Sequence, residues 1–120
     1  MNVVQEKSFE FAVRIVYLCK YLCDEKKEYV LSKQVLRSGT SVGANIEEGL
    51  GGQSDKDFIA KLSIAYKEAR ETIYWIKLLS RTEYLSQEQA DSVLQDADEL
   101  CKIIAKILIT TKNKQKPNNS

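Results

Sequence analysis

The sequence predicts an all-α protein, an antiparallel up-down-up-down four-helix bundle. Apolar residues recur with helical period in four segments. The single proline is Pro117 and the five glycines lie between positions 39 and 52, so no long segment elsewhere is barred from forming a helix. Short connections between the segments place consecutive helices side by side and antiparallel. We expect residues 1–111 to form the bundle and residues 112–120, polar and lysine-rich, to form a disordered basic tail.

Composition narrows the class of function. Eighteen basic and seventeen acidic residues give a formal charge of +1, so no global field draws the chain to nucleic acid or membrane. Neither a signal peptide nor an apolar run of membrane-spanning length is visible, and we expect a cytoplasmic protein without a membrane partner. Histidine, the commonest general base and metal ligand, is absent. We therefore expect no enzymatic activity, no catalytic residue, no metal and no cofactor.

Three cysteines, Cys19, Cys23 and Cys101, occupy apolar positions of their helical patterns. Cys19 and Cys23 lie one turn apart, as two metal ligands could. A zinc site needs a third and a fourth ligand, and none is nearby in the sequence. Because free cysteine behaves as a small hydrophobic residue, we expect all three in the core.

The first helical segment, about residues 6–24, is apolar on two faces. We expect one stripe to face the core, and it comprises Phe9, Ala12, Val13, Val16, Cys19 and Cys23. The other lies nearly opposite and comprises Phe11, Ile15, Leu18 and Leu22. A helix apolar on two faces is buried on two sides, so we expect the second stripe to contact another subunit.

The second segment, about residues 29–50, is unusual for its small and polar residues. Gly39 and Gly43 each cost about 1 kcal/mol of helix propensity relative to alanine, a cost that close packing must offset. A polar seam on one side comprises Ser38, Ser41, Asn45 and Glu48. We expect these side chains to hydrogen-bond across a helix interface. The alternative is a ligand or ion site, which is less favoured because the seam lacks a strong base.

The third segment, about residues 55–81, begins after Ser54, a natural N-cap. Its core stripe comprises Phe58, Leu62, Ala65, Tyr66, Ala69, Ile73 and Ile76. A second apolar ridge, away from that stripe, comprises Ile64, Trp75 and Leu78. Since tryptophan is a frequent anchor at interfaces, we expect this ridge to contribute to subunit contact.

The same segment carries a basic stripe opposite its core face: Lys67, Arg70, Tyr74, Lys77 and Arg81. The four cations could follow the phosphate backbone of RNA or DNA, and the aromatic ring between them could stack on one base. The alternative is a solvated helix face whose positive charge is offset by Glu68 and Glu71. Runs of charged residues more often represent such a face than a binding site.

The fourth segment begins at a capping box formed by Ser86 and Gln89. Its core stripe comprises Ala90, Val93, Leu94, Ala97, Leu100, Cys101, Ile104, Ile107 and Leu108. The acidic residues that precede and interrupt this stripe are scattered over its outer face, so they suggest no paired-carboxylate site.

The stretch Ser41-Val42-Gly43-Ala44-Asn45-Ile46-Glu47-Glu48-Gly49, followed by Ser54 and Asp57-Phe58-Ile59, resembles a known pattern. It is similar to that of the small four-helix-bundle proteins encoded within intervening sequences of bacterial large-subunit ribosomal RNA genes. Gln34, Ala65 and Tyr84-Leu85-Ser86 also fit, and the similarity covers roughly residues 5–110. Gly43 departs from the proline often found at its position.

The resemblance implies a homo-oligomer, most often a ring of five bundles, without established enzymatic activity. The family also includes the accessory subunit of diversity-generating retroelements, which partners a reverse transcriptase and binds nucleic acid. Those relatives are strongly basic, whereas this chain carries a formal charge of +1. We therefore expect a structural or interaction module, with a nucleic-acid-binding accessory protein as the alternative.

Overall fold

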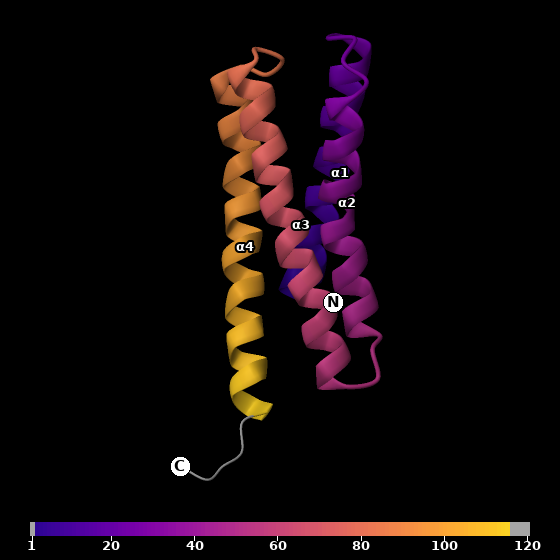
Figure 1. The fold of residues 1–120 in the computed structure, drawn as a ribbon, viewed down its shortest axis with the longest axis vertical. Coiled ribbons are helices and arrows are strands. Elements are labelled where there is room, and N and C mark those ends of the chain that lie inside the picture. The colour runs from indigo at the N-terminus through magenta and orange to yellow at the C-terminus, as the bar shows by residue number, and fades with distance from the viewer. Residues whose placement is uncertain (1, 116–120) are drawn as a thin grey trace.

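The computed structural model describes residues 2–115, which form four helices and no strand (Figure 1). They are α1 (Val3–Asp24), α2 (Leu31–Leu50), α3 (Asp55–Arg81) and α4 (Gln87–Gln115). The three connections lie at alternating ends of an elongated body of 57 × 25 × 22 Å, so consecutive helices run in opposite directions. The predicted all-α four-helix fold is confirmed.

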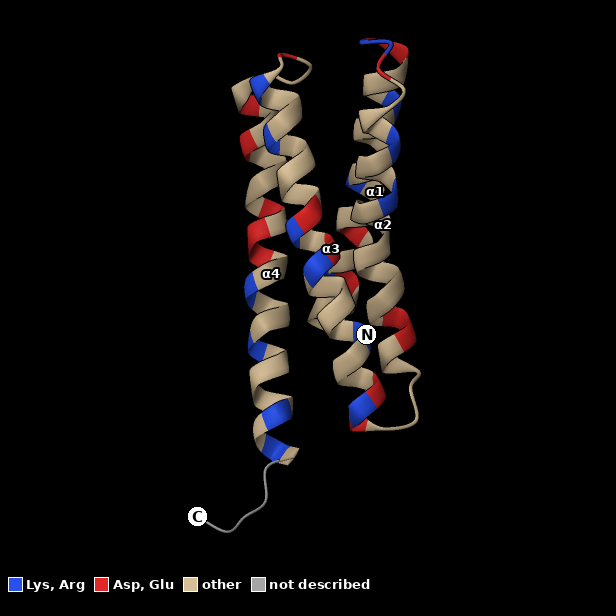
Figure 2. Cartoon of the chain, in the orientation of Figure 1, with Lys and Arg blue, Asp and Glu red and all other residues tan. Residues whose placement is uncertain are grey.

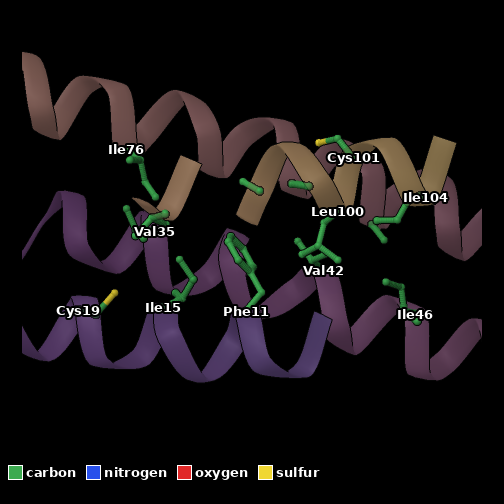
Figure 3. Close-up of a cluster of buried hydrophobic side chains, with 14 of the residues drawn as sticks. Phe11, Ile15, Cys19, Val35, Val42, Ile46, Ile76, Leu100, Cys101 and Ile104 are labelled. Carbon is green, nitrogen blue, oxygen red and sulfur yellow. The ribbon is translucent and has the colours of Figure 1, made fainter. Parts of the chain in front are cut away.

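Each helix packs against its neighbours in chain order, and α1 meets α4 in the smallest of the four contacts. All four helices contribute to one core along the bundle axis (Figure 3). The predicted core stripes of α3 and α4 are confirmed, with Leu62, Ile76 and Ile104 completely buried. Cys19 and Cys101 are also buried, while Cys23 is half-buried.

Helix starts follow local capping chemistry. Ser54 Oγ accepts a hydrogen bond from Asp57 N at 3.1 Å, as predicted. Ser86 and Gln89 form the predicted reciprocal capping box, at 2.9 and 3.1 Å. Two caps were not predicted. Asn2 Oδ1 accepts from Gln5 N at 2.8 Å, and Glu28 Oε1 accepts from Ser32 N at 2.9 Å at the start of α2.

The prediction for the two faces of α1 was wrong. Phe11, Ile15 and Leu22, expected at a subunit interface, are at most 2% exposed and belong to the core, and Leu18 is half-buried. Conversely, Phe9 and Val16, expected in the core, are 64% and 39% exposed. Helical period identifies two apolar stripes but does not determine which one faces the bundle. Packing against α2 decides it, because Ile15 fills the space left by the missing side chain of Gly39.

The end of α4 also differs from the prediction. The helix continues through Lys112 and Lys114 to Gln115, residues that the sequence pattern assigned to a disordered tail. Residues 116–120 lie outside the described part. Acidic residues occupy the first half of α4 and lysines the second half (Figure 2). This distribution complements the helix dipole and favours continuation of the helix.

Candidate functional site

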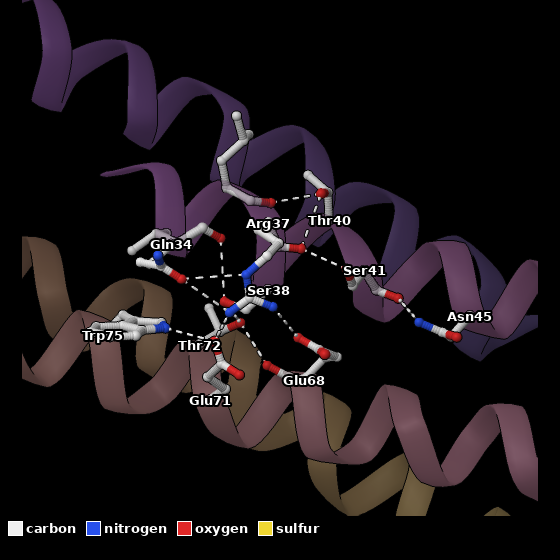
Figure 4. Close-up of polar contacts among 12 residues, drawn as sticks. Gln34, Arg37, Ser38, Thr40, Ser41, Asn45, Glu68, Glu71, Thr72 and Trp75 are labelled. Carbon is white, nitrogen blue, oxygen red and sulfur yellow. Dashed lines mark hydrogen bonds and ion pairs between the residues drawn. The ribbon is translucent and has the colours of Figure 1, made fainter. Parts of the chain in front are cut away.

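The polar seam of α2 crosses to another helix at only one buried point. Ser38 and Thr72 are both completely buried, and their hydroxyl oxygens lie 2.9 Å apart between α2 and α3 (Figure 4). Thr72 also lies 2.8 Å from the carbonyl oxygen of Glu68. The predicted hydrogen bonding across a helix interface is therefore confirmed for Ser38.

For Ser41 and Asn45 the prediction needs correction. Ser41 Oγ donates to the Arg37 carbonyl at 2.7 Å, and Asn45 Nδ2 donates to the Ser41 carbonyl at 2.8 Å, both within α2 (Figure 4). Short polar side chains often bond the carbonyl one turn earlier in this way. Glu48 accepts a hydrogen bond from Lys61 of α3 at 3.1 Å, so it does bond across a helix interface as predicted, although at an exposed position. The four residues thus form no common ligand site.

Arg37 organises a surface cluster that sequence reasoning missed. Its guanidinium pairs with Glu68 at 3.3 Å and with Glu71, so it joins α2 to α3. Trp75 Nε1 donates to the Glu71 carboxylate at 2.9 Å (Figure 4). A single arginine among polar residues of α2 gives no signal of this role in the sequence. Trp75 and Leu78 of the predicted apolar ridge are half-buried, and Ile64, three turns earlier on the same helix, is 42% exposed.

The predicted basic stripe of α3 lies on the surface. Its four cations, Lys67, Arg70, Lys77 and Arg81, are all exposed, and Tyr74 is 60% exposed. The Tyr74 and Trp75 rings meet edge to face with centroids 5.1 Å apart. Among residues 2–115, none of the four cations forms an ion pair.

This geometry bears on the alternative interpretation of the stripe. In that interpretation the carboxylates of Glu68 and Glu71 offset the positive charge of the stripe. In the structure, however, both carboxylates pair with Arg37 of α2. The positive charge of the stripe is therefore not offset by the neighbours on its own helix that the sequence suggested.

A groove of about 820 Å³ lies beside the first half of α1 and is also lined by residues of α2 and α4. It contains five carboxylates and two phenylalanines, but a single lysine. Lys7 lies 2.5 Å from Glu99, and Arg14, just beyond the groove, lies 2.7 Å from Asp96. The hydrogen bond from Lys7 to Glu99 raises the pKa of Lys7. These two pairs connect α1 to α4, and no pattern in the sequence indicated the groove.

Burial favours the protonated form of two thiols, those of Cys19 and Cys101. Burial, with a smaller contribution from Cys23, raises the pKa of Cys19 to about 11. Burial also raises the pKa of Cys101, against the opposing effect of the Arg70 guanidinium. A nucleophilic or metal-binding cysteine requires the thiolate, so both residues suit a core role. In the described part of the chain, no three side chains of the usual ligand types come together around a possible metal position.

No helix within residues 2–115 combines the length and apolar character needed to cross a membrane.

Comparisons with known proteins agree with the fold. A crystal structure of a protein with unknown function from the S23 ribosomal protein family, from Bacteroides thetaiotaomicron VPI-5482, superposes with a TM-score of 0.87. It is 57% identical in sequence, and the match covers 88% of this chain and 98% of that one. No curated protein matches the chain. The profile of the 23S rRNA-intervening sequence protein family matches residues 1–106, and the chain therefore belongs to this family.

Proposed function

We propose that this protein is a non-enzymatic interaction module that acts as a homo-oligomer. The family resemblance implies five copies in the assembly. The observation that carries the proposal is the apolar line along the outer side of α1. Phe9 is 64% and Val16 39% exposed, and half-buried Ala12 and Val13 lie between them. Their spacing of three and four residues makes one continuous strip on the helix surface. Continuous exposed apolar surface of this kind is typical of protein contact sites.

The exposed line replaces Phe11, Ile15 and Leu22 as the candidate contact on α1, since those three residues are buried within the bundle. The ridge of Ile64, Trp75 and Leu78 on α3 stays a second candidate contact. Aromatic anchors such as Phe9 and Trp75 contribute more to association than their neighbours do when they become buried at an interface.

Light scattering coupled to size exclusion tests the proposal at micromolar concentration. We expect a mass several times 13.7 kDa for the wild type, and a monomer for Phe9→Lys. Val30→Lys is the matched control, because Val30 is 72% exposed but lies in the connection between α1 and α2, outside the apolar line. A wild-type mass near 13.7 kDa would reject the proposal.

A second candidate function is nucleic-acid binding through the basic stripe. It is favoured because the four cations of the stripe form no ion pair with any described residue. The slope of log affinity against log salt measures released counterions, about 0.9 per neutralised phosphate of duplex DNA. Replacing Lys67, Arg70, Lys77 and Arg81 by alanine should flatten that slope for RNA or DNA. Replacing Lys20 and Lys33, exposed on α1 and α2, serves as control. Absence of wild-type binding at low salt would exclude this function.

A further inference from the structure

The groove beside α1 has an excess of negative charge that the described residues do not neutralise. Five of its lining residues are acidic: Glu6, Glu10, Glu47, Asp96 and Glu99. Asp96 and Glu99 form ion pairs with Arg14 and Lys7. The other three form none within residues 2–115, and Glu47 accepts only the Gln5 amide, at 2.6 Å. This excess of negative charge favours a cationic partner for the groove.

The groove also presents an apolar anchor. Phe9 lines it with 64% of its surface exposed. Glu6 precedes Phe9 by three residues and lies on the same side of the helix, whereas Glu10 directly follows Phe9 and points about 100° further round the axis. The outer side of α1 thus offers an exposed aromatic ring with two carboxylates on one side of it.

The basic stripe of α3 has the same design with the opposite charge. Tyr74 is 60% exposed, and Arg70 and Lys77 lie one turn before and one turn after it. The Trp75 ring supports Tyr74 from the side, at a centroid distance of 5.1 Å. This surface offers an exposed aromatic ring between two cations.

We propose that the groove of one copy receives the basic stripe of α3 from a second copy, with Phe9 against Tyr74, and Glu6 and Glu10 facing Arg70 and Lys77. The proposal rests on the homo-oligomer proposed above and names the two surfaces that meet. Along the helix axes, Glu6 and Glu10 are about 6 Å apart, and Arg70 and Lys77 about 10 Å. The long side chains of arginine and lysine bridge the difference.

The two surfaces lie on different helices, so the contact is head-to-tail. Each copy then uses its groove toward one neighbour and its stripe toward the other, and such contacts close into a ring or extend as a filament. Opposite charges on the two surfaces fix which face meets which and in which orientation.

Charge distribution favours a second copy over nucleic acid as the partner of the stripe. The chain carries a formal charge of +1, because a comparable number of acidic residues balances the cations. The acidic residues beside α1 that form no ion pair within residues 2–115 would repel a phosphate backbone, whereas they attract the stripe of another copy.

Charge reversal tests the contact with paired variants. One variant carries Arg70→Glu and Lys77→Glu, and another carries Glu6→Lys and Glu10→Lys. We expect each to shift from the wild-type assembly to a monomer of about the wild-type chain mass, 13.7 kDa. A variant with all four substitutions should assemble again, because both surfaces are reversed together. All four positions are exposed, and the recovery of assembly would also show that the substituted chains fold.

Matched controls change the same charge elsewhere on the surface. Lys102→Glu with Lys106→Glu, and Glu88→Lys with Asp91→Lys, alter exposed residues of α4 outside both surfaces. We expect both controls to keep the wild-type mass.

Other outcomes would overturn the inference. An assembly that survives both reversals would leave the homo-oligomer intact and assign its contact to other surfaces. Loss of RNA or DNA binding in the stripe variant, with the assembly unchanged, would assign the stripe to nucleic acid. A wild-type monomer would reject the homo-oligomer, and this contact with it.

Discussion

Cys19 shows how burial controls the chemistry of a single side chain. The residue is 7% exposed, and its thiol lies 3.3 Å from the Ser32 carbonyl oxygen, to which it donates. Burial, and secondarily Cys23, raises its pKa from 9.0 to about 11. The folded protein thus holds the Cys19 proton more tightly than the unfolded chain does. Linkage then requires that folding stability depends on pH in this range.

We predict that the Cys19 contribution to stability is fully present below about pH 9 and is lost as pH rises toward 11. The difference in free energy of unfolding between wild type and Cys19→Ala should shrink over this range, by at most about 2–3 kcal/mol. Urea denaturation at a series of pH values measures it. Val42→Ala, a completely buried control without an ionisable group, should give a difference that does not change with pH. A constant difference for Cys19→Ala as well would contradict the assigned pKa.

At the residue scale, sequence predicts a side chain best when its partner is local. The caps at Ser54 and Ser86 follow from spacing alone. The partner of Arg37 does not, because Glu68 and Glu71 lie on another helix. Residue type is also a poor guide to backbone conformation in the turns, where glycine is the usual residue at a positive φ angle. The positive φ angles of the described residues occur at Lys27 and Glu83, and at none of the glycines.

At the scale of elements, two glycines bring α1 and α2 together. A Cβ atom at position 39 would lie 2.8 Å from the Ile15 side chain. At position 43 it would lie 3.2 Å from the Ser8 carbonyl oxygen, which belongs to the backbone of α1. Both positions are strict, because the Cγ atoms of completely buried Ile15 and the helical backbone at Ser8 have little freedom to move away. The propensity cost of these glycines is offset by the closer packing that they allow.

We predict that Gly43→Leu lowers the free energy of unfolding by about 1–3 kcal/mol, the usual cost of overpacking. The leucine side chain would have to displace the α1 backbone at Ser8. Ala44→Leu is the control on the neighbouring, exposed position of the same helix, and it should change stability by less than about 0.5 kcal/mol. Denaturant unfolding measures both, and equal effects of the two substitutions would show that α1 and α2 are not in close contact at Gly43.

The helices themselves were predictable from the sequence, but the orientation of α1 was not. Period and caps fixed the extent of α3, which begins at Asp55 and ends at Arg81 as expected. On α1, two stripes are apolar, and period alone does not show which one faces the core, so the stripe of Phe9 and Val16 was wrongly expected there. The choice depends on the fit of Ile15 against Gly39, a contact between helices that periodicity does not contain.

At the scale of the whole molecule, the fold follows from short connections between four amphipathic segments. The groove beside α1 does not, because α1, α2 and α4 contribute Phe9, Glu47 and Glu99 from distant parts of the sequence. Carboxylates that look scattered along the chain come together only when the helices pack. The basic stripe was predictable because all its members lie on one helix, where spacing alone gives their position.

The end of α4 tests how far the cooperative fold extends. Lys112, Asn113, Lys114 and Gln115 are helical but exposed, so their main contribution is the favourable interaction of two lysines with the helix dipole. Such interactions contribute about 0.3–1 kcal/mol each at the surface.

We predict that a chain ending at Thr111 loses less than about 2 kcal/mol in free energy of unfolding, the upper limit for two such lysines. A chain ending at Ile107 is the matched control, because it also lacks Leu108, which is 9% exposed in the core. Exposing a leucine costs about a further 1.5–3 kcal/mol, so the control should unfold at clearly lower denaturant concentration. Equal stability of the two truncated chains would mean that the packed core ends before Leu108. A large loss on removing the exposed turn alone would mean that Lys112–Gln115 form part of the cooperative unit.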